Sequence, residues 1–63
     1  LTGNSEAWIE NYRGILEYTG ERILLQAKTC QVCLEGTRLS IDYYTNEDMK
    51  ISGNISALRY LRE

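Results

Sequence analysis

Glycine recurs along this chain at nearly equal intervals, and each recurring glycine is followed by a polar residue. The four glycines are Gly3, Gly20, Gly36 and Gly53, with spacings of 17, 16 and 17 residues. Glycine at the first central position is what a two-residue type II′ hairpin turn requires, because that position has a positive φ. We therefore predict an internal repeat of β-hairpins, with a structural turn at each of the four glycines.

Apolar residues step by two on both sides of each glycine, which is the periodicity of a strand that buries one face. Placing the glycine and its polar follower at the turn fixes which residues face each other across the hairpin. The apolar pairs that follow are Tyr18 with Ile23, Leu16 with Leu25, Leu34 with Leu39, Val32 with Ile41, Met49 with Leu58 and, less well matched, Ile51 with Ser56. The same register places opposite charges face to face, in the pairs Glu35 with Arg38 and Asp48 with Arg59.

The repeat predicts an all-β fold of repeated antiparallel β-hairpins, with about seven or eight short strands forming a small sandwich or open barrel. A short β-solenoid is the alternative, which the facing charges disfavour. Links between hairpins are expected at 12–14 and 44–47, and a strand rather than a helix is expected at 54–63. Near the start, either Trp8 or Ile9 can point inward. The 63 residues amount to a single domain, 1–63, and a chain that begins at Leu1 is expected to be trimmed or partial.

The charge balance bears on the class of partner. The chain has seven basic and nine acidic residues, and the basic ones are scattered. Nucleic acids and anionic membrane surfaces bind clustered Lys and Arg, so neither is expected as a partner. No apolar run approaches the roughly 20 residues of a membrane-spanning helix, so direct membrane insertion is not expected. So small a sheet barely covers its own apolar face, and exposed edge strands pair readily with other strands. A protein partner or self-association is therefore predicted.

The chain contains no histidine, so the usual general base is absent and we expect a protein that is not an enzyme. Cys30 and Cys33 form the one motif that resembles a chemical site. A zinc site needs four ligands and a redox pair normally opens a helix, whereas a strand would turn Cys30 inward and Cys33 outward, as an exposed thiol. We therefore expect no metal and no cofactor, and keep a thiol- or metal-linked regulatory protein as an alternative. A second alternative, from Trp8, Tyr43 and Tyr44, is a small barrel that binds single-stranded nucleic acid.

One segment carries a family resemblance. The stretch IENYRGILEYTGERI, residues 9–23, contains Arg-Gly-Ile-Leu-Glu-Tyr at 13–18, preceded by Asn11 and Tyr12 and followed by a polar turn. Two later stretches, LEGTRLSI at 34–41 and ISGNISALRYL at 51–61, are each built around a glycine. In these features the chain resembles the YabP/YqfC family of sporulation proteins, and its YqfC-like branch in particular, over nearly its whole length. The cysteine pair departs from that family's pattern.

The resemblance implies a small non-enzymatic protein of endospore-forming bacteria, made in the mother cell and linked to assembly of the spore outer layers. It implies a cytoplasmic location, at the surface of the forespore membrane if the partner is a membrane protein of the same programme. Recognition residues are commonly presented at links between elements of a rigid scaffold. We therefore predict a partner surface at Asn11, Arg13 and Gly14. The competing interpretation is that Gly14 supplies a backbone conformation and Arg13 pairs with a nearby carboxylate.

Overall fold

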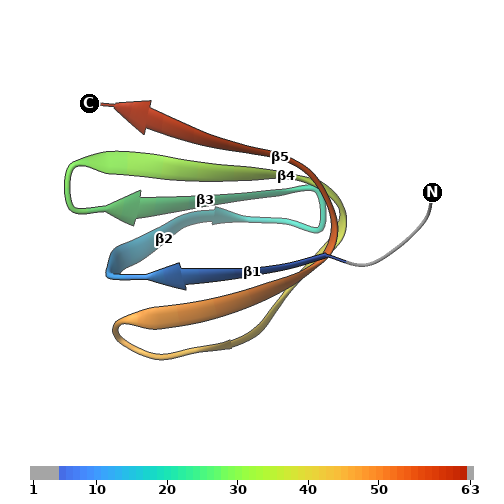
Figure 1. The fold of residues 1–63 in the computed structure, drawn as a ribbon, viewed down its shortest axis with the longest axis horizontal. Helices are drawn as coiled ribbons and strands as arrows, with labels where there is room; N and C mark the ends of the chain where they lie inside the picture. Colours follow the sequence, from blue (N-terminus) through green and yellow to red (C-terminus); the bar gives the residue numbers. More distant parts are fainter. Residues whose placement is uncertain (1–4, 63) are drawn as a thin grey trace.

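A computed structural model describes residues 5–62 as one antiparallel sheet of five strands (Figure 1). The strands are β1 (Ser5–Glu10), β2 (Tyr12–Tyr18), β3 (Arg22–Ala27), β4 (Cys30–Tyr44) and β5 (Asp48–Arg62), in the order β1-β5-β4-β3-β2. The predicted all-β class is confirmed, and so is a strand rather than a helix after residue 54. Over the described residues the sheet stays open rather than closing into a barrel. The solenoid alternative is wrong, because solenoid strands pair in parallel.

The strands are fewer and longer than the glycine spacing predicts. β4 and β5 are 15 residues each and pair with each other from Cys30 opposite Arg62 to Tyr44 opposite Met49. Figure 1 shows the two strands curving together around one end of the molecule. β3 pairs with the first half of β4 only, and β1 pairs with the first half of β5 only. The turns predicted at Gly36 and Gly53 are therefore wrong, while the turn predicted at Gly3 lies outside the described residues.

Gly36 and Gly53 are instead the points where the long strands bend and approach each other closely. A Cβ atom on Gly36 would lie 1.9 Å from the carbonyl oxygen of Asn54. A Cβ atom on Gly53, which has φ of 137°, would lie 2.5 Å from the carbonyl oxygen of Arg38. Pairing of β4 with β5 shifts register on both sides of this point, and Arg38 takes a left-handed φ of 56°. Glycine inside a strand often marks a bulge and a close backbone approach, and it does so here.

The continuous strands change most of the predicted partners. Tyr18 opposite Ile23 is confirmed, because the chain does turn between them. Leu25 faces Ile15 rather than Leu16, since a bulge falls between Ile15 and Glu17. The remaining predicted pairs are wrong, and the observed ones across β4 and β5 are Leu34 with Leu58, Val32 with Tyr60, Ile41 with Ile51 and Tyr44 with Met49. The predicted charge pairs are wrong for the same reason, and Arg59 instead forms an ion pair with Glu35 at 3.5 Å.

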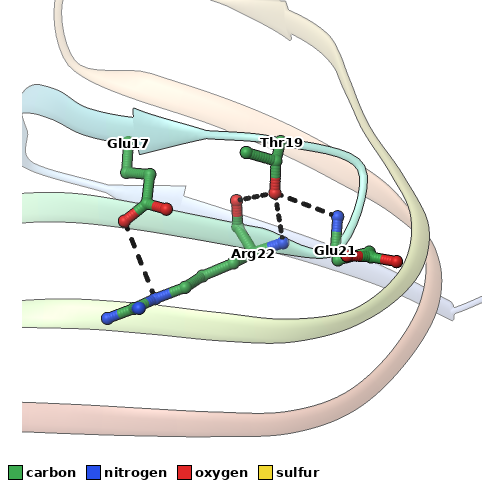
Figure 2. Close-up of polar contacts among 4 residues, drawn as sticks. All are labelled: Glu17, Thr19, Glu21 and Arg22. Carbon is green, nitrogen blue, oxygen red and sulfur yellow. Dashed lines mark hydrogen bonds and ion pairs between the residues drawn. The ribbon is translucent and has the colours of Figure 1, made fainter.

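The turn predicted at Gly20 is present, but threonine rather than glycine organises it. Gly20 does not take the positive φ of a type II′ turn. The Thr19 hydroxyl oxygen accepts hydrogen bonds from the amides of Glu21, at 3.1 Å, and Arg22, at 2.9 Å (Figure 2). Such a threonine bond to the backbone two or three residues ahead is a recurrent way to stabilise a turn.

The same turn recurs between β4 and β5. There the Thr45 hydroxyl oxygen accepts from the amides of Glu47, at 3.1 Å, and Asp48, at 3.0 Å. The expected link at 44–47 is thus confirmed, whereas 12–14 belongs to β2 and the link before it is Asn11 alone. The structural repeat is therefore Tyr-Thr-Gly-Glu at 18–21 and Tyr-Thr-Asn-Glu at 44–47, and not the glycine spacing.

The bend folds the sheet onto its own apolar face. Leu39, Met49 and Ile51 from one half join residues of the other half in a single buried cluster, completed by Tyr12, Ile23, Leu25, Val32 and Leu34. Leu34 and Leu39 therefore do share the core, although they are not paired. Ile9 packs against the cluster, and Trp8 is 58% exposed, which settles the choice between them. Helices with the length and hydrophobicity of a membrane span do not occur in the described part of the chain.

Candidate functional site

Asn11 is the whole connection between β1 and β2, and its backbone conformation is unusual. Its φ is 63°, in the left-handed region that asparagine tolerates better than most residues. Its amide donates a hydrogen bond of 2.7 Å to the carbonyl oxygen of Glu47, in the turn between β4 and β5. Two segments far apart in the sequence are thereby held together at this corner of the sheet.

An open pocket of about 440 Å³ lies at this corner and is lined by Asn11, Tyr12, Arg13, Lys28 and Glu47. Tyr12 is the buried residue of this lining, and its hydroxyl group donates a 2.6 Å hydrogen bond to the carbonyl oxygen of Thr45. Arg13, Lys28 and Glu47 are exposed and take part in none of the ion pairs among residues 5–62. The structure thus places Asn11 and Arg13 at one pocket with Lys28 and Glu47, and their role as a partner surface stays a prediction.

Gly14 does not line the pocket. It lies in β2 opposite Gln26, at one side of a register shift that leaves Arg13 bulged. A Cβ atom on Gly14 would meet nothing within 4 Å, so space alone does not require glycine here. Arg13 has no carboxylate partner among the described ion pairs either. The competing interpretation gave Gly14 a special backbone conformation and Arg13 a carboxylate partner. Gly14 does not have a positive φ, and Arg13 is in none of the ion pairs of the described residues, so these observations support neither part.

The second half of β5 forms a free edge of the sheet. Residues 57–62 pair with β4 on one side. On the other side, β1 pairs only with the first half of β5, as far as Gly53. Figure 1 shows this half of β5 at the margin of the sheet, and β4 is its only neighbour among the strands of residues 5–62. Three large apolar side chains on it are exposed: Leu58 by 41%, Tyr60 by 69% and Leu61 by 40%. The sequence pattern placed Leu58 on the buried face opposite Met49, because it assumed a hairpin turn at Gly53 that the continuous strand does not make.

An exposed aromatic cluster lies on the outer face of β1 and β5. The Trp8 and Tyr43 rings are 5.8 Å apart and edge to face, and the Lys50 ammonium lies 5.4 Å from the Trp8 ring centre. The same ammonium is 3.4 Å from a Glu6 carboxylate oxygen and 3.8 Å from one of Asp42. Aromatic platforms for single-stranded nucleic acid are accompanied by positive charge, whereas two carboxylates surround the one lysine here.

The two cysteines lie on opposite faces of β4, as predicted, and both are free thiols. Cys30 packs against the core, but Cys33 is only 3% exposed, so the predicted exposed thiol is wrong. The outer face is covered at this point because Cys33 lies between Leu24 and Arg59 on the neighbouring strands.

Arg22 adds to this cover. A hydrogen bond to the Cys33 side chain, followed by the nearby Glu17 carboxylate, raises the pKa of the Arg22 guanidinium above its usual value. The Arg22 Nε atom lies 3.8 Å from a Glu17 carboxylate oxygen, and this ion pair is drawn in Figure 2. Among residues 5–62 no group of three or more histidine, cysteine, aspartate or glutamate side chains is arranged to hold a metal ion.

The sequence was compared with models of known protein families and with curated proteins. A family model described as the YabP family matches residues 1–63, which is the full length of the sequence. No curated protein gives a significant match to the chain.

Proposed function

The chain belongs to the YabP family, and we propose on that basis that it acts in sporulation as a non-enzymatic module for protein interaction and assembly. Family membership itself supports a sporulation-related protein. The finer proposal is that the chain contributes to formation of the spore outer layers by binding another protein.

The observation that supports this proposal is the large share of apolar side chains that the fold leaves exposed. In residues 5–62, nine hydrophobic side chains are buried and nine large ones are exposed. Scattered exposed apolar residues are ordinary on a protein surface. Here, however, several of them line strand edges, where backbone groups are also unpaired, and this combination is typical of surfaces that bind other proteins.

The predicted partner surface at Asn11, Arg13 and Gly14 is retained in the proposal, with Lys28 added. Arg13 and Lys28 present two cationic groups at the rim of one pocket, beside the single carboxylate of Glu47. Two unpaired cations favour a carboxylate from a partner, and an arginine binds such a group through two parallel hydrogen bonds. In this proposal Gly14 adjoins Arg13 on the partner surface, outside the pocket lining, and adds no side chain there.

The partner and location are proposed from the resemblance to YqfC-like proteins. The partner is a protein of the sporulation programme, with a membrane protein as the first candidate, and the site of action is the mother-cell side of the forespore membrane. A second copy of the chain is the alternative partner.

The test is purification of the tagged protein from sporulating cells after brief crosslinking, with light scattering on the isolated protein. We expect a protein that co-purifies in stoichiometric amount with the original sequence. The variant Arg13→Glu with Lys28→Glu is expected to recover at least about tenfold less of it, because two charge contacts are reversed. The matched control Arg38→Glu changes a cation outside the pocket. A strict monomer that co-purifies with nothing would refute the proposal.

A further inference from the structure

The free edge of β5, residues 57–62, belongs to a part of the sheet in which the strands pair regularly. Here β3, β4 and the second half of β5 pair without a register shift. At one end Gln31 of β4 lies between Gln26 and Leu61, and at the other Glu35 of β4 lies between Arg22 and Ala57. Along a regular edge, every second residue directs its amide and carbonyl groups away from the sheet. Residues 57–62 therefore present a row of unpaired donors and acceptors at strand spacing, which is a template for one more strand.

Among the other edges of the sheet, those of β2 and of the second half of β4 are interrupted, whereas β1 pairs with β5 without a register shift. β2 has two bulges, at Arg13 and Leu16, and the second half of β4 has a register shift between Ile41 and Tyr43. Bulges twist an edge and remove its regular pairing pattern, which is how many proteins protect edges from further pairing. The edge at 57–62 has no such protection.

The side chains on this edge indicate the chemistry of the strand that would fit it. Leu58 and Tyr60 lie opposite Leu34 and Val32, so they extend the apolar face beyond the part that the other half of the sheet covers. Arg59 lies on the opposite face, 63% exposed and 3.5 Å from a Glu35 carboxylate oxygen, and Arg62 lies at the end of the strand. No acidic residue occurs between Asp48 and Arg62. A second copy of the same edge, paired so that Arg59 faces Arg59 or Arg62, would bring like charges together, which is unfavourable across a strand pair.

We propose that residues 57–62 of β5 bind, by strand addition, an extended segment of a partner protein in which acidic and apolar residues alternate. The added strand places its apolar residues beside Leu58 and Tyr60 and a carboxylate beside Arg59. Its backbone groups pair with the unpaired groups of the edge. This inference rests on the proposed function, and it names the kind of segment that the partner supplies.

The test uses two synthetic probes, each a blocked seven-residue peptide: one alternates valine with glutamate, the other valine with lysine. Binding to the full chain is followed by fluorescence anisotropy, and the contact residues by shifts of backbone amide resonances. We expect the glutamate peptide to bind at least about tenfold more tightly than the lysine peptide, because cross-strand charge pairs change sign. Amide shifts are expected to concentrate at residues 57–62, and added salt is expected to weaken binding.

Two variants and a control make the assignment specific. The change Arg59→Glu with Arg62→Glu is expected to reverse the preference between the two peptides. The change Leu58→Lys with Tyr60→Lys is expected to abolish binding of both, since lysine on an edge opposes strand addition. The control Tyr44→Lys alters a residue that is 63% exposed at the edge of the second half of β4, and it is expected to leave binding unchanged.

Equal affinity for the two peptides, shifts confined to other strands, or a dimer formed through residues 57–62 would each overturn the inference. Its failure is separable from failure of the proposed function. If the Leu58→Lys, Tyr60→Lys protein still recovers the sporulation partner while the Arg13→Glu, Lys28→Glu protein does not, the interaction stands and the β5 edge is not its site.

Discussion

The carbonyl oxygen of Asn54 occupies the position from which any side chain at Gly36 would begin. The distance from that oxygen to an ideal Cβ on Gly36 is 1.9 Å, well inside the closest approach that such atoms make. Gly36 is in β4 and Asn54 is in β5, so this contact lies at the point where the two long strands bend. The absence of a side chain at position 36 thus permits the bend that folds one sheet over a shared core.

The first prediction concerns this contact. Gly36→Ala is expected to lower the free energy of unfolding by about 3 kcal/mol or more, because two backbones must separate to admit the methyl group. A domain of this size has a small margin of stability, so much of the variant should be unfolded at room temperature. Urea denaturation followed by circular dichroism measures the change.

Gly14→Ala is the matched control, because a Cβ atom there meets nothing within 4 Å. It is expected to be neutral or slightly stabilising, since alanine restricts the unfolded chain more than glycine does. Equal losses for the two variants would contradict the role assigned to Gly36.

The second prediction concerns the two threonine turns. Thr19→Val and Thr45→Val keep the shape of the side chain but remove the hydroxyl group that two backbone amides contact. Each change is expected to cost about 1 kcal/mol of stability, the usual net value of such hydrogen bonds. Thr37→Val, which removes a single exposed contact with Asn54 at 3.4 Å, serves as the control and should cost less. Similar losses in all three variants would argue against a special role for the turns.

The third prediction concerns thiol reactivity. Cys30 is half-buried and Cys33 is 3% exposed beneath Arg22 and Arg59, so Cys30 should react first with an alkylating reagent. The order is read by mass spectrometry of peptides from the folded protein, and in urea the two rates should converge. Faster labelling of Cys33 in the folded protein would show that the outer face of β4 is not covered as described.

The fourth prediction separates two roles of Asn11. Asn11→Gly should leave stability nearly unchanged because glycine also accepts a φ of 63°, whereas Asn11→Ala should cost about 1 kcal/mol. If Asn11 contacts the partner through its side chain, the glycine variant should fold normally and yet recover less partner. Full recovery with the glycine variant would limit Asn11 to a backbone role.

The sequence predicted the all-β fold class correctly, but it predicted the turns between strands less well. Alternation in residues 30–35 and 57–62 predicted strands correctly, because period two follows from the strand itself. Glycine, however, serves both tight turns and the bulges of a bent strand, and the local pattern does not distinguish the two uses. The repeated Tyr-Thr-X-Glu at 18–21 and 44–47 was the more informative signal, since its threonines make the turn contacts.

The candidate site was predictable in part. Asn11 and Arg13 were predicted because they lie at an expected link between hairpins, in the stretch that carries the family resemblance, and the structure places both at one pocket. Lys28 and Glu47 join them only through tertiary contact between two turns, which no local pattern reveals. The free edge at 57–62 was hidden for a different reason, namely that alternation marks a sheet face as apolar without saying whether anything covers it.

Amide hydrogen exchange along β5 tests the central claim most directly, because that claim is a strand flanked on both sides in its first half and on one side in its second. The account predicts slow exchange at successive amides within 49–52. Over 57–62 it predicts alternation, with slow amides facing β4 and fast ones facing the open edge. Uniformly slow exchange over 57–62 in the isolated protein, or uniformly fast exchange there, would contradict it.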